Sequence, residues 1–204
     1  RLLRSWLASP LARDESCVLV FVGENDSGEY GRELQRAIAE SGLEDRIRIT
    51  GWVDAAGFRA YLHAADVGVQ LRTLSRGETS AAVLDCMNHG LATIVNANGS
   101  MGDLPNDGVL KIPDSFTDDQ LMEALTILHR DVSRRETLGV RAREIIRTRH
   151  GPDACASRYA DAIEAFYKDA GTSAKALVDR MATLALETDL PPTAAQLRDA
   201  AQAI

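Results

Sequence analysis

The segment from Leu71 to Gly90 contains the residue types that can hold a phosphate group and a sugar. It opens on a loop rich in Arg, Gly, Glu, Thr and Ser. A helical pattern follows, with Ser80 as the expected N-cap and Gly90 as the expected C-terminal stop. The unpaired N–H groups at the start of such a helix attract an anion, so we expect this loop to bind a phosphate.

Three charged side chains in the same segment extend this prediction. Arg72 and Arg76 can clamp a phosphate through paired hydrogen bonds. Asp85 lies about a turn and a half into the helix, where its carboxylate can accept hydrogen bonds from two sugar hydroxyls. The combination suits a nucleotide sugar.

The elements around this segment alternate between strand and helix patterns. Strand patterns occupy residues 17–22, 47–49, 67–71, 91–96 and 109–112. Helical patterns occupy residues 1–11, 31–42, 54–65, 80–89, 117–129, 133–149, 152–167, 173–187 and 193–204. Such alternation with short connections predicts an α/β fold, a Rossmann-like doubly wound parallel sheet followed by extra C-terminal helices.

Four loops with ligand-binding residue types each follow a strand pattern. They span residues 23–24, 51–52, 72–80 and 98–103. Because ligands of doubly wound sheets bind beyond the carboxyl ends of the strands, we expect these loops to converge on one site.

Composition excludes several classes of protein. The net charge of -7 argues against a nucleic-acid-binding protein, because such proteins present a concentrated basic surface. Cys17, Cys86 and Cys155 lie far apart without a C-x-x-C pair, which favours a reduced, cytoplasmic protein without a metal cluster. No apolar run reaches the ~20 residues that span a bilayer. No signal peptide precedes the first strand pattern. Because the first residue is Arg1 rather than Met, we expect a fragment of a longer protein.

Taken in order, these motifs resemble the C-terminal half of a retaining glycosyltransferase of the GT-B fold, family 4, also called group 1. The family's strand ending in V-G is matched by L-V-F-V-G at 19–23, and its F-x-G-x-V by I-T-G-W-V at 49–53. Its signature loop and helix parallel G-E-T-S-A-A-V-L-D-C-M-N-H-G-L-A-T-I at 77–94, and its G-G-x-x-E-L turn parallels G-S-M-G-D-L at 99–104. The resemblance covers residues 18–167.

The resemblance implies that several matched residues bind a nucleotide-sugar donor. Asp85 falls on the carboxylate that holds the ribose in the family. The backbone amides of Thr79 and Ser80 fall where the family binds the diphosphate, and Trp52 and Val53 would flank the base.

Two further loops complete the implied donor site. Gly23 would let the donor approach the backbone. The turn at 99–103, with Gly99 and Asp103, would face the transferred sugar or its phosphate.

Two departures from the family pattern concern the implied catalytic groups. The carboxylate that contacts the donor sugar falls on Gly77 in a gapless alignment, and we assign its role to Glu78, one position later. The family's first strand and its Lys-containing loop are missing before Arg1, so Arg72 and Arg76 are the expected substitutes at the diphosphate.

Several of these residues have a purely structural alternative. Glu78 can pair with Arg76 or cap the helix that begins at Ser80. Asp85 can be a solvated carboxylate, and Trp52 can fill space in the core.

Other residues are expected to be structural in the first place. Cys86, Met87 and His89 should pack in the core or end a helix rather than bind a metal. Asp103 can have a structural role in its turn instead of a ligand role. The Arg-rich helix at 134–149 should present a solvated face, with contact to an acidic membrane as the alternative.

These patterns predict a nucleotide-sugar-binding domain at 1–170 and a helical extension or linker at 171–204. The resemblance implies transfer of a hexosyl-type sugar from a nucleotide diphosphate donor to a saccharide or lipid-linked glycan acceptor in polysaccharide biosynthesis. It implies neither a metal nor another cofactor. The missing N-terminal GT-B lobe would be the partner that supplies the acceptor site, so the fragment alone would be inactive.

Two other functions are compatible with the same fold. One is a catalytically inactive lobe that serves as a scaffold or interaction module in a multidomain protein, and the other is a nucleotide-sugar epimerase. For the transferase we expect a cytoplasmic location, with the inner face of the membrane as the alternative.

Overall fold

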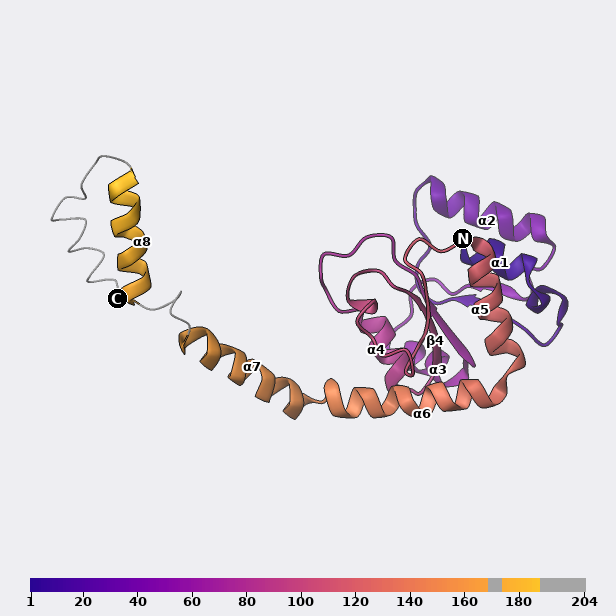
Figure 1. Ribbon diagram of the computed structural model, residues 1–204. Coiled ribbons are helices and arrows are strands. Elements are labelled where there is room, and N and C mark those ends of the chain that lie inside the picture. The colour runs from indigo at the N-terminus through magenta and orange to yellow at the C-terminus, as the bar shows by residue number, and fades with distance from the viewer. Residues whose placement is uncertain (169–173, 188–204) are drawn as a thin grey trace. The chain divides into compact units, whose positions relative to one another are not determined.

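A computed structural model describes residues 1–168 and 174–187 (Figure 1). The helices are α1 Leu2–Ala8, α2 Glu29–Ser41, α3 Ala55–Ala64, α4 Ala81–Asn88, α5 Asp118–Arg130, α6 Val132–Arg149, α7 Pro152–Lys168 and α8 Ala174–Glu187, with 3₁₀-helices η1 Pro10–Arg13 and η2 Gly99–Met101. The strands are β1 Leu19–Phe21, β2 Ile47–Ile49, β3 Val67–Gln70, β4 Ala92–Asn96 and β5 Leu110–Ile112. The predicted α/β alternation is confirmed, and the helix expected at 193–204 lies outside the described residues.

The described strands run parallel, but they form two sheets rather than the single sheet expected. β1 pairs with β2, with Leu19 beside Ile47. β3, β4 and β5 form the second sheet in that order, with Ile94 beside Leu110. Ile47 and Ile94 belong to one hydrophobic cluster, so side-chain packing rather than a hydrogen-bond ladder joins the two sheets.

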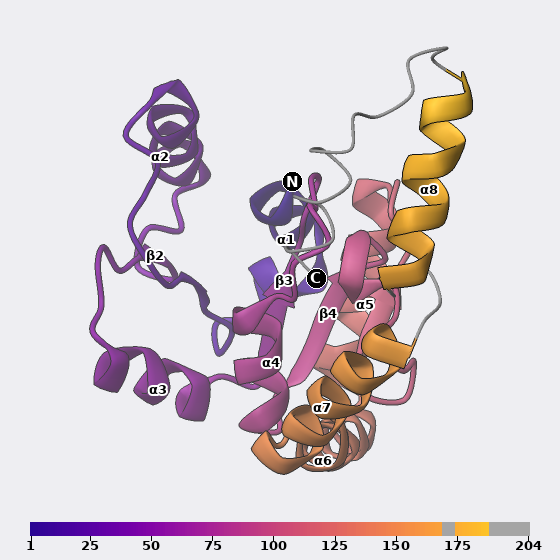
Figure 2. The same ribbon diagram turned by 90° about the vertical axis from the view of Figure 1, so that its left-hand side faces the viewer.

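Helices cover both faces of β4, as its apolar run predicts for a parallel strand. Ile94 is fully buried in the cluster that includes Trp6 of α1 and residues of α5. Val95 is fully buried in a second cluster, with Met87 of α4 and Ala142 of α6. Figure 2 shows α4 and α5 on opposite sides of β4. The strand ends and their loops are therefore held between two helical layers.

Local sequence signals set several helix ends. Asp54 caps α3 by accepting the backbone N–H of Gly57 at 2.7 Å. Thr117 and Gln120 form a reciprocal capping box at the start of α5. Gly90 follows α4 with φ +70°, a conformation that favours glycine. The caps predicted at Asp54 and Gly90 are thus confirmed.

Contacts divide the chain into two compact units, Arg1–Thr148 and Arg149–Ile204. The first unit contains all five described strands, and the second contains α7 and α8. The domain boundary expected at residue 170 stays a prediction. Among the described helices, none combines the length and the apolar character that crossing a membrane requires.

The contact between α6 and the turn after α4 generates a testable prediction. A Cβ at Gly139 would collide with the backbone carbonyl of Gly90. We therefore expect Gly139→Ala to lower the free energy of unfolding by about 1–3 kcal/mol, although alanine favours helices by about 1 kcal/mol over glycine. Urea unfolding measures the change.

The matched control lies next to it on α6. Val140 is 66% exposed, so Val140→Ala should stay within about 0.5 kcal/mol of the wild type. An unchanged or raised stability of Gly139→Ala would contradict this close approach.

Candidate functional site

The loop after β3 is fixed by Asn96, the last residue of β4. Asn96 is fully buried, its Oδ1 accepts the backbone N–H of Arg72 at 2.8 Å, and its Nδ2 donates to the Arg72 carbonyl at 2.7 Å. Nδ2 also donates to Oδ1 of Asp114, just beyond β5, at 3.1 Å. One amide side chain therefore joins the carboxyl ends of three neighbouring strands.

The turn after β4 packs against this loop. Ser100 donates its hydroxyl to the carbonyl of Glu78 at 2.8 Å. Gly99 has φ +54°, and a Cβ at this position would collide with the side chain of Ser75. The two loops therefore form one polar surface at the carboxyl edge of β3 and β4. Of the four loops predicted to converge, these two lie together, and convergence with the loops at 23–24 and 51–52 stays a prediction.

The carboxylate of Glu78 closes the first loop on itself. Its Oε2 accepts the backbone N–H of Arg76 at 2.7 Å, and its Oε1 pairs with the guanidinium of Arg72. The backbone N–H groups of Glu78 and Arg76, followed by the charge of Arg72, hold the pKa of Glu78 below its ordinary value. A structural role for Glu78 is therefore observed, but its side-chain partner is Arg72, and Arg76 contributes only its backbone.

The start of α4 differs from the prediction in one respect. Ser80 occupies the N-cap position, but its side chain makes no cap hydrogen bond. Its ψ is 104°, against 174° at Asp54, which does cap its helix. The hydroxyl is buried without a hydrogen-bond partner among the described residues. The first N–H groups of α4 are consequently left without a side-chain cap, which suits an anion.

The neighbouring candidates lie at the surface of the same region. Thr79 immediately precedes Ser80 and is exposed, and Asp85 is exposed on the second turn of α4. Asp103 is exposed at the end of the turn after β4, where its N–H donates to the carbonyl of Ser100 at 3.3 Å. The ligand roles of these residues stay predictions.

The loops after β1 and β2 form a second group. The N–H of Gly23 donates to Oγ1 of Thr50 at 3.0 Å, and Gly23 and Gly51 form an isolated antiparallel bridge. Gly23 has φ +135°, a conformation that side chains rarely adopt. Val53 is half-buried, but Trp52 is 72% exposed. The alternative that Trp52 fills the core is therefore wrong, and its indole is accessible to a ligand.

Residues expected to pack do so. Cys86 and Met87 are buried in core clusters, which confirms the packing prediction. His89 ends α4, with its Nδ1 2.9 Å from the carbonyl oxygen of Asp85.

Two positioning residues were missed from the sequence. Asn96 is a polar residue at the end of a buried strand. This polar residue in a mostly apolar run could have indicated a positioning role from the sequence. Lys111 of β5 donates to the carbonyls of Gly102 and Leu104 at 2.6 Å each. This ammonium holds the turn after β4.

Solved structures share this fold. Sucrose-phosphate synthase from Thermosynechococcus elongatus is 22% identical with a TM-score of 0.64, over 79% of this chain and 41% of that chain. HepE from Anabaena, solved in complex with UDP and glucose, is 17% identical with a TM-score of 0.68, over 80% and 44%. The C-terminal domain of LpcC, a group 1 family glycosyl transferase from Francisella tularensis, is 16% identical with a TM-score of 0.65, over 74% and 77%.

The chain thus spans less than half the length of the first two of these proteins. Its class is the Rossmann-like α/β lobe of the GT-B glycosyltransferases. The family model for glycosyl transferases group 1 matches residues 2–131, and the chain belongs to this family. No curated protein is significantly similar to it in sequence.

The hydrogen bonds of Glu78 predict a depressed pKa that depends on Arg72. In a carboxyl NMR titration, Arg72→Ala should move the pKa of Glu78 part of the way back to its ordinary value, because the backbone donors remain. Arg76→Ala is the control and should leave this pKa almost unchanged, because Arg76 contributes its backbone N–H. A larger rise in Arg76→Ala than in Arg72→Ala would contradict the observed pairing.

The sign of the pH effect follows from the same shift. Because the folded pKa is lower than the unfolded one, these interactions are fully present above the unfolded value of about 4.3. They are lost as the pH falls through the folded pKa.

The role of Asn96 predicts a loss of protection in the loop after β3. Asn96→Leu should lower the free energy of unfolding by about 1–3 kcal/mol, because the Arg72 backbone and Asp114 lose their buried partner. Amide hydrogen exchange at Arg72 should accelerate. Thr93→Val, which removes another buried polar group of β4 at the opposite end, is the control and should leave this amide unchanged.

Proposed function

We propose that this domain is the donor-binding lobe of a glycosyltransferase that moves a sugar from a nucleotide diphosphate donor onto a saccharide or lipid-linked glycan, in polysaccharide biosynthesis. The observation that carries the proposal is the loop at 72–80, which Asn96 and the turn at 98–103 hold at the start of α4. The loop puts two arginines and a carboxylate before the uncapped N–H groups of a helix, an arrangement that suits a diphosphate. Membership of the group 1 family supports the same function.

The donor would lie across the loops with its nucleotide toward α4. Asp85 would accept hydrogen bonds from the ribose hydroxyls. The backbone N–H groups of Thr79 and Ser80 would donate to the diphosphate. The exposed indole of Trp52 would stack on the base, with Val53 beside it.

The transferred sugar would face Glu78 and the turn that contains Gly99 and Asp103. In the present structure the Glu78 carboxylate pairs with Arg72. A bound diphosphate would compete for Arg72 and release part of that carboxylate to accept hydrogen bonds from the sugar. The loop would therefore exchange an internal ion pair for two contacts with the donor.

The proposed chemistry is electrostatic stabilisation of the leaving group. As the bond between the anomeric carbon and the diphosphate oxygen breaks, negative charge grows on the diphosphate. Arg72, Arg76 and the first N–H groups of α4 would stabilise this charge without a metal. The configuration at the anomeric carbon would be retained. A second, N-terminal lobe would bring the acceptor, so we expect this lobe alone to bind donor weakly and not to turn over.

A scaffold role is the second candidate, and two observations favour it. Glu78 and Arg72 already satisfy each other, which weakens the case for a catalytic carboxylate. α7 exposes Tyr159 and Ile163, apolar side chains that suit contact with another protein domain.

Contact with an acidic membrane at the cytoplasmic face is a further part of the proposal, and it concerns the arginines of α6. Arg135 and Arg143 donate to backbone carbonyls, and Arg141 pairs with two carboxylates. Only the other arginines of this helix, such as Arg134 and Arg147, are proposed to reach lipid phosphates.

The donor site predicts that Asp85→Ala weakens binding of a nucleotide diphosphate sugar at least about tenfold, because a hydrogen bond to a charged group contributes about 1.5–3 kcal/mol. Isothermal titration calorimetry of the full-length protein with UDP-, GDP- and dTDP-sugars measures this change. Glu123→Ala removes an exposed carboxylate from another helix, α5, and serves as the control.

The outcomes separate the function from the site. Absence of binding to all three donors by the intact protein would refute the transferase and favour the scaffold. Binding that Asp85→Ala leaves unchanged would keep the function but refute this placement of the ribose.

A further inference from the structure

A cluster of three metal-ligating side chains lies on the opposite edge of the fold from the donor loops. Asp14 and Cys17 belong to the turn that precedes β1, and His129 lies in the last turn of α5. Strand β1 begins after this turn, so the cluster lies at the amino end of the strand. The ligand atoms of the three residues all lie within 4.8 Å of one another. Among residues 1–168 and 174–187, this is the group that could hold a metal ion.

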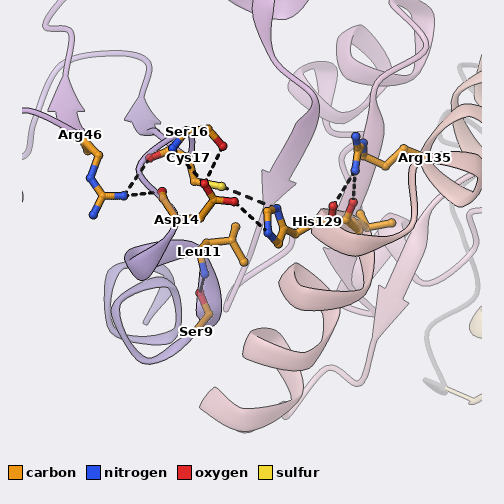
Figure 3. A network of polar contacts seen from close by, with 9 residues as sticks. Ser9, Leu11, Asp14, Ser16, Cys17, Arg46, His129 and Arg135 are labelled. Carbon is orange, nitrogen blue, oxygen red and sulfur yellow. Dashed lines mark hydrogen bonds and ion pairs between the residues drawn. The ribbon is translucent and has the colours of Figure 1, made fainter.

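The separations within the cluster fit a small tetrahedral site. Cys17 Sγ lies 3.6 Å from Nδ1 of His129, and Asp14 Oδ2 lies 3.3 Å from Nε2 of the same ring (Figure 3). Sulfur and nitrogen ligands of one tetrahedral zinc ion lie about 3.6 Å apart, and nitrogen and oxygen ligands about 3.3 Å apart, given the usual bond lengths. The Cys17 distance is to Nδ1 and the Asp14 distance is to Nε2, and one ring nitrogen coordinates at a time. Binding would therefore require the side chains to rearrange so that a single ring nitrogen faces the ion together with the thiol and the carboxylate.

The turn that carries Asp14 and Cys17 is already held in shape. The guanidinium of Arg46 donates to the backbone carbonyls of Ala12, Asp14 and Cys17. The backbone N–H and the hydroxyl of Ser16 donate to Oδ1 of Asp14 at 3.0 and 2.7 Å, which leaves Oδ2 directed at His129. Such support of a ligand by its neighbours is typical of metal sites.

The helix end that carries His129 is held as well. Arg135 donates to the carbonyls of Leu128 and His129, as Figure 3 shows. Both halves of the cluster are therefore positioned by an arginine that binds backbone carbonyls. A metal ion would have to order little more than the three side chains, which lowers the entropic cost of binding.

We infer that Asp14, Cys17 and His129 bind one zinc ion, which joins the turn before β1 to the end of α5. Thiolate, imidazole and carboxylate together are the ligand set of zinc rather than of magnesium or calcium. With Asp14 and Cys17 ionised, the two negative charges balance the ion. A water molecule completes the tetrahedron. The site lies at the amino end of β1, away from the loops proposed to bind the donor, so the ion would tie a turn to a helix rather than contact the donor.

The test titrates zinc into the untagged protein by competition with a chromophoric chelator, and then replaces zinc with cobalt. We expect one ion per chain, with a thiolate-to-cobalt charge-transfer band and the visible bands of a tetrahedral site. Cys17→Ser should abolish the charge-transfer band. Cys17→Ser and His129→Gln should each weaken zinc binding by at least about 100-fold. Loss of a residue that only hydrogen-bonds to a ligand already costs about 10–100-fold in metal affinity, and loss of the ligand itself should cost more.

Two control variants keep the result specific to this cluster. Cys155→Ser and His150→Gln change a cysteine and a histidine of the second compact unit and should leave affinity and spectrum unchanged. Ser16→Ala should weaken zinc binding about tenfold, because Asp14 loses its orienting hydroxyl. If Cys17→Ser fails to fold by circular dichroism, Asp14→Asn and His129→Gln carry the test.

The thermal stability of the protein gives an independent readout. Zinc should raise the midpoint of thermal unfolding of the wild type, and a chelator should reverse the rise. The rise should be absent in His129→Gln and present in His150→Gln. Absence of binding at micromolar zinc, or equal losses in the cluster variants and the controls, would overturn the assignment.

Discussion

The buried amide of Asn96 is the interaction on which the carboxyl edge of the fold depends. A side-chain amide without access to water must satisfy both its donors and its acceptor within the protein. Asn96 does so only because the backbone of Arg72 and the carboxylate of Asp114 come to it from either side. This requirement fixes where the chain leaves β3, and with it the course of the loop that leads to α4.

The loop that Asn96 holds in place carries charged side chains that are arranged by contacts within the loop. Glu78 accepts a backbone N–H within the loop and pairs with Arg72, so one carboxylate both shapes the loop and neutralises an arginine. Ser80 leaves the first N–H groups of α4 uncapped. Under the proposed function, a diphosphate would replace Glu78 as the partner of Arg72. Asn96 and Ser100 would hold the loop backbone in place during this exchange.

The amino edge is organised by a different kind of contact. There, guanidinium groups bind backbone carbonyls: Arg46 holds the turn before β1, and Arg135 holds the end of α5. Between them lie a thiol, an imidazole and a carboxylate. The carboxyl edge carries the charged side chains of the loop after β3, and the amino edge ties a helix to the turn before a strand. The zinc ion proposed at the amino edge is compatible with the metal-free transfer proposed at the carboxyl edge.

The sequence by itself determined the α/β alternation, the caps at Asp54 and Gly90, and the family, because these depend on side chains a few residues apart. It also indicated that the donor loops follow strands. It could not show that Asn96 holds Arg72, that the Glu78 side chain pairs with Arg72, or that the sheet divides in two. Nor could it reveal that Cys17 meets His129, 112 residues away. Asn96 meets Arg72 because β3 pairs with β4, and Cys17 meets His129 because the turn before β1 and α5 pack into one hydrophobic cluster. Long-range packing, and not local propensity, decides which polar groups meet at the two edges.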